Sequence, residues 1–524
     1  MSGVNLDRHL AHRLGDRHLR GDPGRKSTQS EDWNRVCLVA SPEVSVTEGG
    51  QHLLWMVTNL LARQFGVIQE LVLSIPEVPV VPCCFPFGSG ENLQLALLNT
   101  AKMIAGAAMS LGTSPGPPKD TSLLITVGQA PDLFVEIPTI AALGDGFRAF
   151  CGLPSNQPSV VPSNRCPLGP YFAACLVAGE AFKHLAGLRP GAGSQLDALF
   201  YSVWDHRAYN TWDEMSDPTV TELTLPDVYV VGLGAVGQAL LASLVAWPGL
   251  QGHMTIVDKD IIDDTNLNRY VLAVQDSIGQ SKTELAKVYL EAAHFTAYAY
   301  PDTWQKYCQD FARPTQRPNL AQKEMAFRYE LVLSCVDKNS ARHAIQSFWP
   351  RILIGGSTLD LRAMVSLYDI KSGGECLKCF NPVETTATLE EFAESIRSIP
   401  ADERQELYEE AGVNGALIEV YLERPRCGTL GEAALRRFQD QTQKHEWSVG
   451  FVSVAAGLLM GSRLIRMAVH GIRSAFPPEL GNSALFNFLN PAPRWSKMNA
   501  RVGCDCQSSG LEEYRRLWGS DELM

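Results

Sequence analysis

The feature that most constrains the fold is a glycine-rich turn between two short apolar segments in the second half of the chain. The turn reads GLGAVG, and its glycines have the spacing GxGxxG: Gly232, Gly234 and Gly237. The apolar run 228–231 precedes it, and an apolar-periodic segment (QALLASLVAW) and a second apolar run, 254–257, come after it. This order predicts strand, turn, helix and strand, which is the βαβ unit of a parallel α/β sheet.

A turn of this kind is typical of a nucleotide site. Glycine allows the backbone to approach a phosphate closely, and the N-terminus of the following helix favours negative charge. Asp258, which closes the second apolar run, is placed to hold a ribose hydroxyl. These residues alone suit NAD or FAD as well as ATP, so an NAD-dependent oxidoreductase is one open alternative.

The residues after Asp258 favour a triphosphate. Asp260 is followed by the sequence NLNR, residues 266–269, and then by GQSK, which ends at Lys282. An adenylation transition state spreads charge over the α-phosphate and the leaving pyrophosphate, and fixed cations stabilise that charge. Asp337 follows the apolar run 331–336, so we expect it at the carboxyl edge of the sheet, where a carboxylate suits Mg²⁺.

The run GLGAVG, VDKDIIDDTNLNRY, IGQSK and SCVDKNSAR resembles the ThiF/MoeB/HesA superfamily, which includes the ubiquitin-activating enzymes, over about residues 225–510. The resemblance implies that ATP and Mg²⁺ are bound. It assigns the ribose to Asp258, the phosphates to Asn266, Arg269 and Lys282, and Mg²⁺ to Asp337.

Two close pairs of cysteines predict a metal site: Cys376, Cys379, Cys504 and Cys506. A CxxC pair directs two thiolates at one ion, and a second pair completes a tetrahedral zinc site. ThiF-like enzymes carry two CxxC pairs at matching places, whereas the second pair here is CxC. We expect a structural zinc that ties the C-terminus to the end of the sheet, and the alternative is four free cysteines.

Cys427 is the candidate nucleophile. Ubiquitin-activating relatives place the cysteine that forms a thioester between the first cysteine pair and the late helix. Arg424 and Arg426 lie within three residues of Cys427 and favour the thiolate. Cys335 competes but is expected inside a strand, and Cys308 is expected in a polar region. An insertion at about 381–440, with charged helices over 383–425, is expected to carry Cys427 and to surround it.

The first half of the chain repeats the plan of the second in weaker form. Strands are expected at Val36–Ala40, Leu71–Ile75 and Leu123–Val127, with an amphipathic helix at His52–Phe65. No GxGxxG follows the first strand, and no acidic residue closes the second. The small-residue-rich segments 169–185 and 450–465 also resemble each other. We therefore predict two Rossmann-like ThiF-type domains, a degenerate one at 1–220 and an active one at 221–524.

Composition narrows the partners and the compartment. A net charge of −12 argues against a general nucleic-acid binder. The polar N-terminal segment is unlike a signal peptide, and the apolar stretch 450–460 predicts a buried helix, not a membrane span. Thirteen cysteines without a secretion signal favour metal binding or catalysis in a reducing cytoplasm.

The resemblance implies ATP-dependent adenylation of the C-terminal carboxylate of a ubiquitin-like protein, and the residues above are consistent with that reaction. Thioester formation on Cys427 and transfer to a conjugating-enzyme-like protein would follow. The compact format is similar to activating enzymes of bacterial ubiquitin-like conjugation operons of the Bil type, which are linked to antiphage defence. The alternatives are a sulfur-carrier adenylyltransferase and a catalytically inactive scaffold. The chain is expected to act as a pseudo-dimer or a homodimer, with Arg8 or Arg13 reaching the γ-phosphate.

Overall fold

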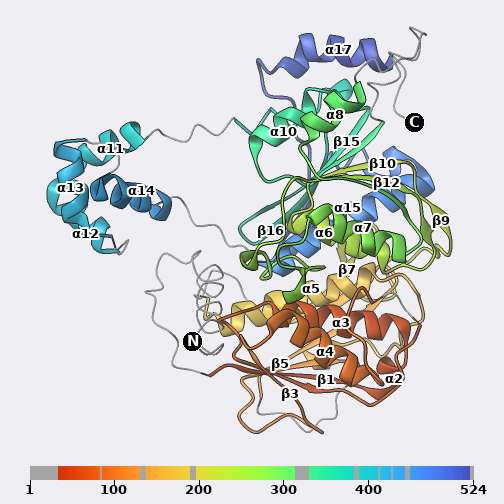
Figure 1. Cartoon of the computed structure of the whole chain (residues 1–524). Coiled ribbons are helices and arrows are strands. Elements are labelled where there is room, and N and C mark those ends of the chain that lie inside the picture. The colour runs from red at the N-terminus through yellow and green to blue at the C-terminus, as the bar shows by residue number, and fades with distance from the viewer. Residues whose placement is uncertain are drawn as a thin grey trace.

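Two large sheets, one from each half of the chain, form the body of the protein (Figure 1). The computed structural model describes residues 33–82, 85–129, 137–188, 196–312, 330–382, 389–410, 413–425, 429–442 and 449–519. A layer of helices between the sheets joins them, because a single apolar core runs from the first sheet through these helices to the second.

The first sheet has eight strands in the order β3-β2-β1-β4-β5-β6-β7-β8. They are β1 (Arg35–Ala40), β2 (Glu70–Ser74), β3 (Ser110–Thr113), β4 (Leu123–Val127), β5 (Thr139–Asp145), β6 (Arg148–Gly152), β7 (Ala198–Ser202) and β8 (Arg207–Tyr209). Neighbouring strands from β3 to β5 are parallel, and those from β5 to β8 are antiparallel.

The second sheet has the same plan, in the order β13-β12-β10-β14-β15-β16-β17-β18. Its strands are β10 (Val228–Val231), β12 (His253–Val257), β13 (Thr296–Tyr300), β14 (Leu331–Ser334), β15 (Ile352–Leu359), β16 (Arg362–Leu367), β17 (Ser483–Asn487) and β18 (Ala492–Ser496). The pairs from β13 to β15 are parallel and the rest antiparallel. The shared order and directions confirm the predicted fold class of two Rossmann-like domains and support a duplication.

Long helices from both halves form the layer between the sheets. α3 (Glu48–Ala62) and α6 (Ala235–Val245) follow the first strand of each half, and α5 (Leu168–Leu185) and α15 (Gly450–His470) come late in each half. α5 packs on α3, α15 packs on α6, and α5 and α15 pack on each other. Other helices of the body are α2 (Pro42–Ser45), α4 (Leu93–Ala105), α7 (Lys282–Ala292), α8 (Trp304–Ala312), α10 (Asn339–Gln346), α16 (Ile472–Ala475) and α17 (Ser509–Trp518).

Two of these helices differ from the prediction. α3 begins at Glu48, because Thr47 caps it by accepting a hydrogen bond from the Gly50 N–H, and it is buried on every side instead of being amphipathic. α15 is 21 residues long and by length and composition could cross a membrane, but 78% of its most apolar window is buried inside the protein. It is therefore the predicted buried core helix, although it is longer than the apolar stretch 450–460.

The short strands β9 (Leu223–Thr224) and β11 (Leu250–Gln251) pair with each other, so Leu223 already belongs to the second half. The first sheet ends at Tyr209, so the chain has joined the second half by Leu223. The division at residue 220 lies between these points and stays a prediction.

The insertion forms a helical bundle with its own small core, to one side of the two-sheet body in Figure 1. Its helices are α11 (Leu389–Arg397), α12 (Ala401–Glu410), α13 (Gly415–Glu423) and α14 (Leu430–Thr442). The core contains Ala393, Ile396, Tyr408, Ile418, Tyr421, Leu422, Leu435 and Phe438. Arg404 binds both carboxylate oxygens of Glu419 at 2.7 and 2.8 Å, which joins α12 to α13.

Candidate nucleotide-binding site and cysteine cluster

In the glycine turn between β10 and α6, two positions, Gly232 and Gly237, have no space for a side chain. Gly232 has a φ of +93°, and a Cβ there would lie 2.9 Å from the carbonyl carbon of Cys335. A Cβ on Gly237 would lie 2.1 Å from the Gly232 carbonyl oxygen, so α6 lies directly against the turn. α6 begins after Gly234, and no side chain caps its N-terminus. Such an end presents backbone N–H groups to an anion.

Asp258 is fixed beside this turn by the backbone. One carboxylate oxygen accepts the Leu233 N–H at 2.6 Å, and the other accepts the Asp260 N–H at 2.9 Å. Burial raises the pKa of Asp258, while the nearby Lys282 ammonium and the two N–H groups oppose that rise. The carboxylate is thereby held at the end of β12, where the prediction placed the ribose ligand.

Lys282 links the two acidic residues of the DKD sequence. Its Nζ lies 3.1 Å from Asp260 Oδ2 and 4.0 Å from Asp258 Oδ1. Burial favours the neutral amine, but the Asp258 and Asp260 carboxylates and Tyr270 outweigh it, so the pKa of Lys282 is raised. The side chain is 7% exposed and remains a cation at neutral pH.

Tyr270 is a site residue that the sequence reasoning missed. The Arg269 guanidinium carbon lies 5.2 Å and Lys282 Nζ 5.3 Å from the centre of the Tyr270 ring, which are cation–π distances. The Tyr270 hydroxyl lies 3.5 Å from the position that a Cβ on Gly234 would occupy, so the ring reaches the glycine turn. The available signal was its place directly after the NLNR sequence.

The NLNR segment is organised by its own side chains. The side-chain oxygen of Asn266 accepts the Asp263 N–H at 2.9 Å. The Nδ2–H groups of Asn266 are the donors that would contact a phosphate. Arg269 donates through Nη1 to the Thr265 carbonyl at 2.8 Å and to Asn268 Oδ1 at 2.7 Å. These bonds hold the guanidinium close to the loop that carries it.

Asp337 lies on the other side of the glycine turn. β14 ends at Ser334, two residues earlier than predicted, and the Cys335 N–H donates to the Val231 carbonyl at 2.8 Å. The exposed carboxylate of Asp337 comes two residues later, beyond the carboxyl end of the strand. The structure therefore brings the glycine turn, Asp258, Lys282 and Asp337 to one edge of the second sheet, while their roles stay predictions.

The corresponding edge of the first sheet is covered by the chain itself. β2 is followed by Ile75 and Pro76, neither of which offers a carboxylate. Gln51, near the start of α3, donates to the carbonyls of Ser45 and Pro79 and accepts the Val81 N–H. The segment after β2 is thus tied to the N-terminal turns of α3, whereas the equivalent end of α6 in the second half has no side-chain cap.

The four predicted metal ligands come together where the chain after β16 meets the segment before α17. Cys376 Sγ lies 3.6 Å from Cys504 Sγ and 3.8 Å from Cys379 Sγ, and Cys379 Sγ lies 3.6 Å from Cys506 Sγ. Four sulfurs around a tetrahedral zinc at about 2.3 Å would be about 3.8 Å apart. The spacing fits a metal site and is too long for disulfides, so this donor set is suited to one thiophilic ion.

The ten cysteines of the described residues are all buried. Cys335 lies just after β14 and not inside the strand as predicted, but it is buried, and burial raises its pKa to about 12. The prediction of a polar setting for Cys308 is wrong: its side chain has no exposed surface and packs with Trp304 and Tyr307, because this face of α8 is turned toward the sheet. Cys427 and Arg426 lie outside the described residues, as do Arg8 and Arg13.

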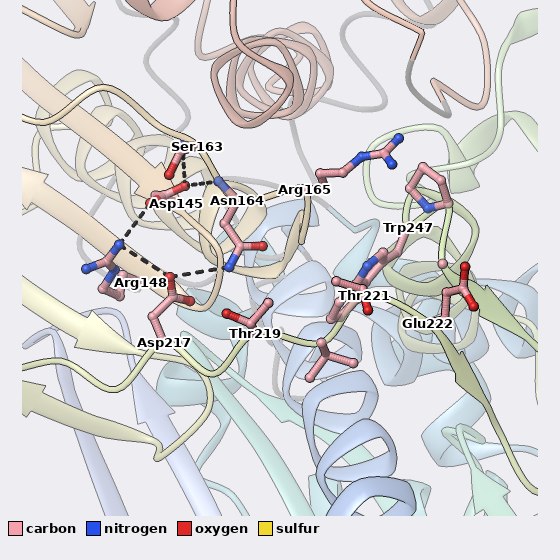
Figure 2. Close-up of a pocket in the computed structure, with 13 residues that line it drawn as sticks. Asp145, Arg148, Ser163, Asn164, Arg165, Asp217, Thr219, Thr221, Glu222 and Trp247 are labelled. Carbon is pink, nitrogen blue, oxygen red and sulfur yellow. Dashed lines mark hydrogen bonds and ion pairs between the residues drawn. The ribbon is translucent and has the colours of Figure 1, made fainter.

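A cavity of about 480 Å³ lies at the junction of the two halves, away from the predicted residues (Figure 2). Arg148 bonds there to Asp145 at 2.9 Å and to Asp217 at 3.3 Å. Asp145 also accepts the N–H groups of Ser163 and Asn164. The polar groups of the cavity thus bind one another and hold the segment that contains Asp217 against β5 and β6 of the first sheet.

The fold and the glycine-turn site define a nucleotide-binding α/β protein with two similar halves. The model of the ThiF family matches residues 206–507 of this chain, and the chain belongs to that family.

Two relatives show how far the similarity extends. The uncharacterized protein y4jF of Sinorhizobium fredii is 24% identical over 507 residues, which are 90% of this chain and 89% of that protein. The adenylyltransferase and sulfurtransferase UBA4 of Meyerozyma guilliermondii is 31% identical over 185 residues, which are 34% of this chain and 40% of UBA4. This chain thus matches less than half the length of UBA4 but nearly all of y4jF.

Among solved structures, the crystal structure of E. coli MccB with MccA-N7isoASN is 15% identical to this chain. It covers 53% of this chain and 66% of its own, with a TM-score of 0.32. A likeness this weak does not bear on function.

Proposed function

We propose that this chain uses ATP and Mg²⁺ to adenylate the C-terminal carboxylate of a ubiquitin-like protein. The observation that carries the proposal is the pair of cations, Arg269 and Lys282, that both contact the Tyr270 ring, whose hydroxyl reaches the glycine turn. A hydride-transferring enzyme has no need of two cations there, whereas the α-phosphate and departing pyrophosphate do. The relative UBA4 is named an adenylyltransferase, and this name supports an adenylation reaction.

In the first step the glycine turn positions ATP, and the cations stabilise the charge that develops on the phosphates. The turn N–H groups and the α6 N-terminus bind phosphate oxygens, and Asp258 accepts hydrogen bonds from ribose hydroxyls. A carboxylate oxygen of the ubiquitin-like protein attacks the α-phosphorus, and the bond to pyrophosphate breaks. Arg269 and Lys282 stabilise the charge that develops. Asp337 would hold Mg²⁺, which supplies further positive charge at the phosphates.

In the second step Cys427 takes the acyl group. Its thiolate attacks the carbonyl carbon of the adenylate, the bond to AMP breaks, and a thioester remains for transfer to a conjugating-enzyme-like protein. Two observations support Cys427. The ten described cysteines are buried, and Cys427 belongs to the stretch between α13 and α14 of the insertion.

The proposal also includes a division of labour within the chain. Residues 221–524 are taken to carry the activity, with the insertion at 381–440 bearing Cys427, and residues 1–220 to bind no nucleotide. The cluster of Cys376, Cys379, Cys504 and Cys506 is taken to hold a structural zinc. The protein is proposed to act in the cytoplasm of a bacterium. Its gene is proposed to lie in a Bil-type operon that also encodes the ubiquitin-like protein and a conjugating-enzyme-like protein.

A second candidate is the activation of a sulfur carrier without a thioester on Cys427. It is favoured by the match to UBA4, whose name includes sulfurtransferase. Both candidates share the adenylation step and differ only in the fate of the acyl adenylate.

Calorimetry with ATP·Mg²⁺ and with NAD tests the nucleotide, and the expected result is binding of ATP alone. Lys282→Ala and Asp337→Ala should abolish ATP–pyrophosphate exchange driven by the ubiquitin-like protein of the neighbouring gene. Lys287→Ala is the matched control, because Lys287 lies on the same helix but pairs with Glu291 on the surface. Binding of NAD without ATP would refute the adenylation proposal.

Cys427→Ala distinguishes the two candidates. It should retain pyrophosphate exchange but lose the thiol-sensitive adduct with the ubiquitin-like protein on a non-reducing gel. If the wild-type enzyme exchanges pyrophosphate and forms no adduct, the sulfur-carrier candidate is supported instead.

A further inference from the structure

Arg63, in the first half of the chain, contacts the nucleotide site of the second half. It caps the C-terminal end of α3, and its side chain is almost fully buried, with 1% of the residue exposed. Nη1 donates to the Leu267 carbonyl at 2.7 Å, and Nη2 donates to the carbonyls of Val271 at 3.1 Å and Ala273 at 2.8 Å. Three carbonyl acceptors in the second half therefore converge on one guanidinium of the first.

The bonded segment is the one that carries the phosphate-binding cation. Leu267 is the second residue of the NLNR sequence, and Arg269 and Tyr270 lie between it and the other two acceptors. The two Nη groups of the Arg63 guanidinium (the Arg63 fork) thus fix both ends of the stretch that carries Arg269 and Tyr270. Its planar geometry suits this role, because the donors point in fixed directions.

Asn59, one turn earlier on α3, completes the arrangement. Its side-chain oxygen accepts the Arg63 Nε–H at 2.7 Å, and its Nδ2 donates to the Val271 carbonyl at 3.1 Å. A buried polar group that loses its partner is not compensated by water, so the contact strongly favours one position of the loop.

We infer that Arg63 is the positioning residue through which the first half places Arg269 and Tyr270 against the phosphates of ATP. This inference rests on the proposed use of ATP and deepens it. It assigns to the half without a glycine turn a part in nucleotide binding that works through the main chain of the 267–273 segment. Arg63 touches the loop and not the nucleotide, so phosphate affinity should depend on it more than adenosine affinity.

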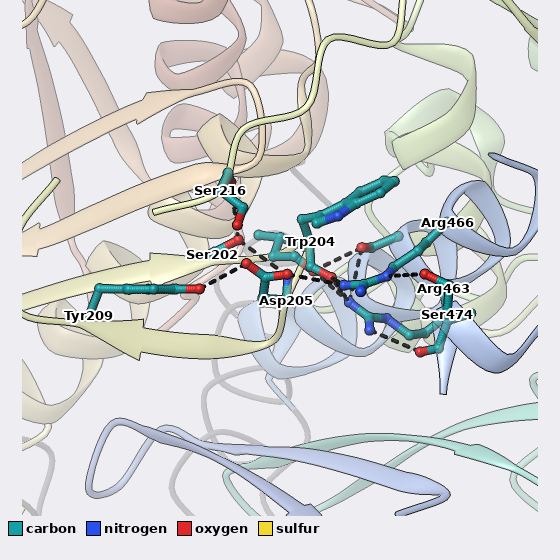
Figure 3. A network of polar contacts seen from close by, with 11 residues as sticks. Ser202, Trp204, Asp205, Tyr209, Ser216, Arg463, Arg466 and Ser474 are labelled. Atoms are coloured by element: carbon teal, nitrogen blue, oxygen red, sulfur yellow. Dashed lines mark hydrogen bonds and ion pairs between the residues drawn. The ribbon is translucent and has the colours of Figure 1, made fainter. Parts of the chain in front are cut away.

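Arg463 on α15 provides a matched control (Figure 3). It is as deeply buried as Arg63, and it also bonds carbonyls, those of Val203, Trp204 and Ala475. Its neighbour Arg466 pairs with Asp205 at 3.1 Å in the same network. The acceptors of Arg463 are remote from the NLNR segment in sequence and belong to the β7–β8 connection and α16.

The experiment compares Arg63→Met with Arg463→Met in the full-length protein. Calorimetry would measure the dissociation constants of ATP·Mg²⁺ and of adenosine, and thermal melting would measure stability. Both variants should melt earlier than the wild type. Arg63→Met should bind ATP at least tenfold more weakly and adenosine within about twofold of the wild type, since only the phosphate contacts are displaced. Arg463→Met should bind both ligands like the wild type.

Two milder variants cover the case in which Arg63→Met does not fold. Arg63→Lys keeps the charge without the fork, and Asn59→Ala keeps Arg63 but removes two bonds from the network. Each should weaken ATP binding by a smaller factor, with adenosine binding unchanged.

Unchanged ATP affinity in folded Arg63 and Asn59 variants would overturn the inference, as would equal losses in Arg63→Met and Arg463→Met or a parallel loss of adenosine affinity. In these cases the wild type still binds ATP, and the proposed function is unaffected. Failure of the wild type to bind ATP would overturn both.

Discussion

Replacing Cys506 with serine should release the metal and open the C-terminal helix, while the second sheet stays folded. Cys504 and Cys506 directly precede α17, and two hydrogen bonds of this helix reach the body. Tyr514 donates to the Arg351 carbonyl at 2.9 Å, and the Trp518 indole donates to the Trp349 carbonyl at 2.8 Å. The half-exposed Lys378–Asp505 ion pair at 3.3 Å also joins the two cysteine pairs, but a surface pair contributes little, so the metal is expected to be the strongest link between them.

The size of the effect depends on the contacts that remain. The two hydrogen bonds contribute about 1 kcal/mol each, whereas ordering a residue costs roughly 1–2 kcal/mol of backbone entropy. A structural thiolate site contributes on the order of 10 kcal/mol to the fold that it joins. If a third of that contribution stabilises α17, its loss removes about 3 kcal/mol of local stability, which is more than a hundredfold loss of amide protection.

Elemental analysis and hydrogen exchange together test this. The wild type should carry one zinc per chain, and Cys506→Ser should carry almost none and lose protection in 509–518. Cys308→Ser is the control, because Cys308 is equally buried but lies outside the cluster. Freshly purified, active wild-type protein without zinc, or a zinc-free Cys506→Ser with full protection in α17, would refute the reasoning.

Three further outcomes are expected. Gly237→Ala should abolish ATP binding, because its Cβ would meet a carbonyl oxygen at 2.1 Å, whereas Gly112→Ala, with open space around it, should bind ATP normally in the same calorimetric assay. Tyr270→Ala should weaken ATP binding about tenfold by removing both cation–π contacts, and Tyr270→Phe should largely retain it; equal losses would show that the hydroxyl matters more than the ring. Burial lowers the pKa of His206 from 6.5 to about 3, so the unfolded chain binds the extra proton and stability falls as the pH drops below 6.5. His206→Gln should remove about 2 kcal/mol of that loss at about pH 5, and an unchanged acid dependence of the melting temperature would contradict this.

The parts of the fold that reflect local patterns could be predicted from the sequence. β10 and β4 have the predicted bounds, because each is a short apolar run with a turn at its end. The predicted bounds of β14 are too long, since Cys335 and Val336 continue the apolar run after the strand has ended at Ser334. Apolar composition alone does not distinguish the last strand residue from the buried turn after it.

The missed residues depend on contacts between distant parts of the chain. Arg63 looks like an ordinary helix-terminal arginine in the sequence, and its acceptors lie more than 200 residues away. The role of Tyr270 depends on Lys282 returning to the same ring from the next helix. Motif spacing predicts residues that contact a ligand, but it carries no signal for residues that act through another part of the backbone.

The two halves share a topology, but the equivalent helices α6 and α3 make different contacts at their ends. α6 leaves its N-terminus open beside the glycine turn, whereas the corresponding end of α3 is tied to the chain after β2 through Gln51. The other end of α3 carries Arg63, which bonds to the 267–273 segment of the second half. Because α3 is buried along its length, its two ends are held in a fixed relation. Through α3 the first half thus contacts the segment that carries Arg269 and Tyr270, and this contact is the physical basis of the inference that it positions the proposed nucleotide site of the second half.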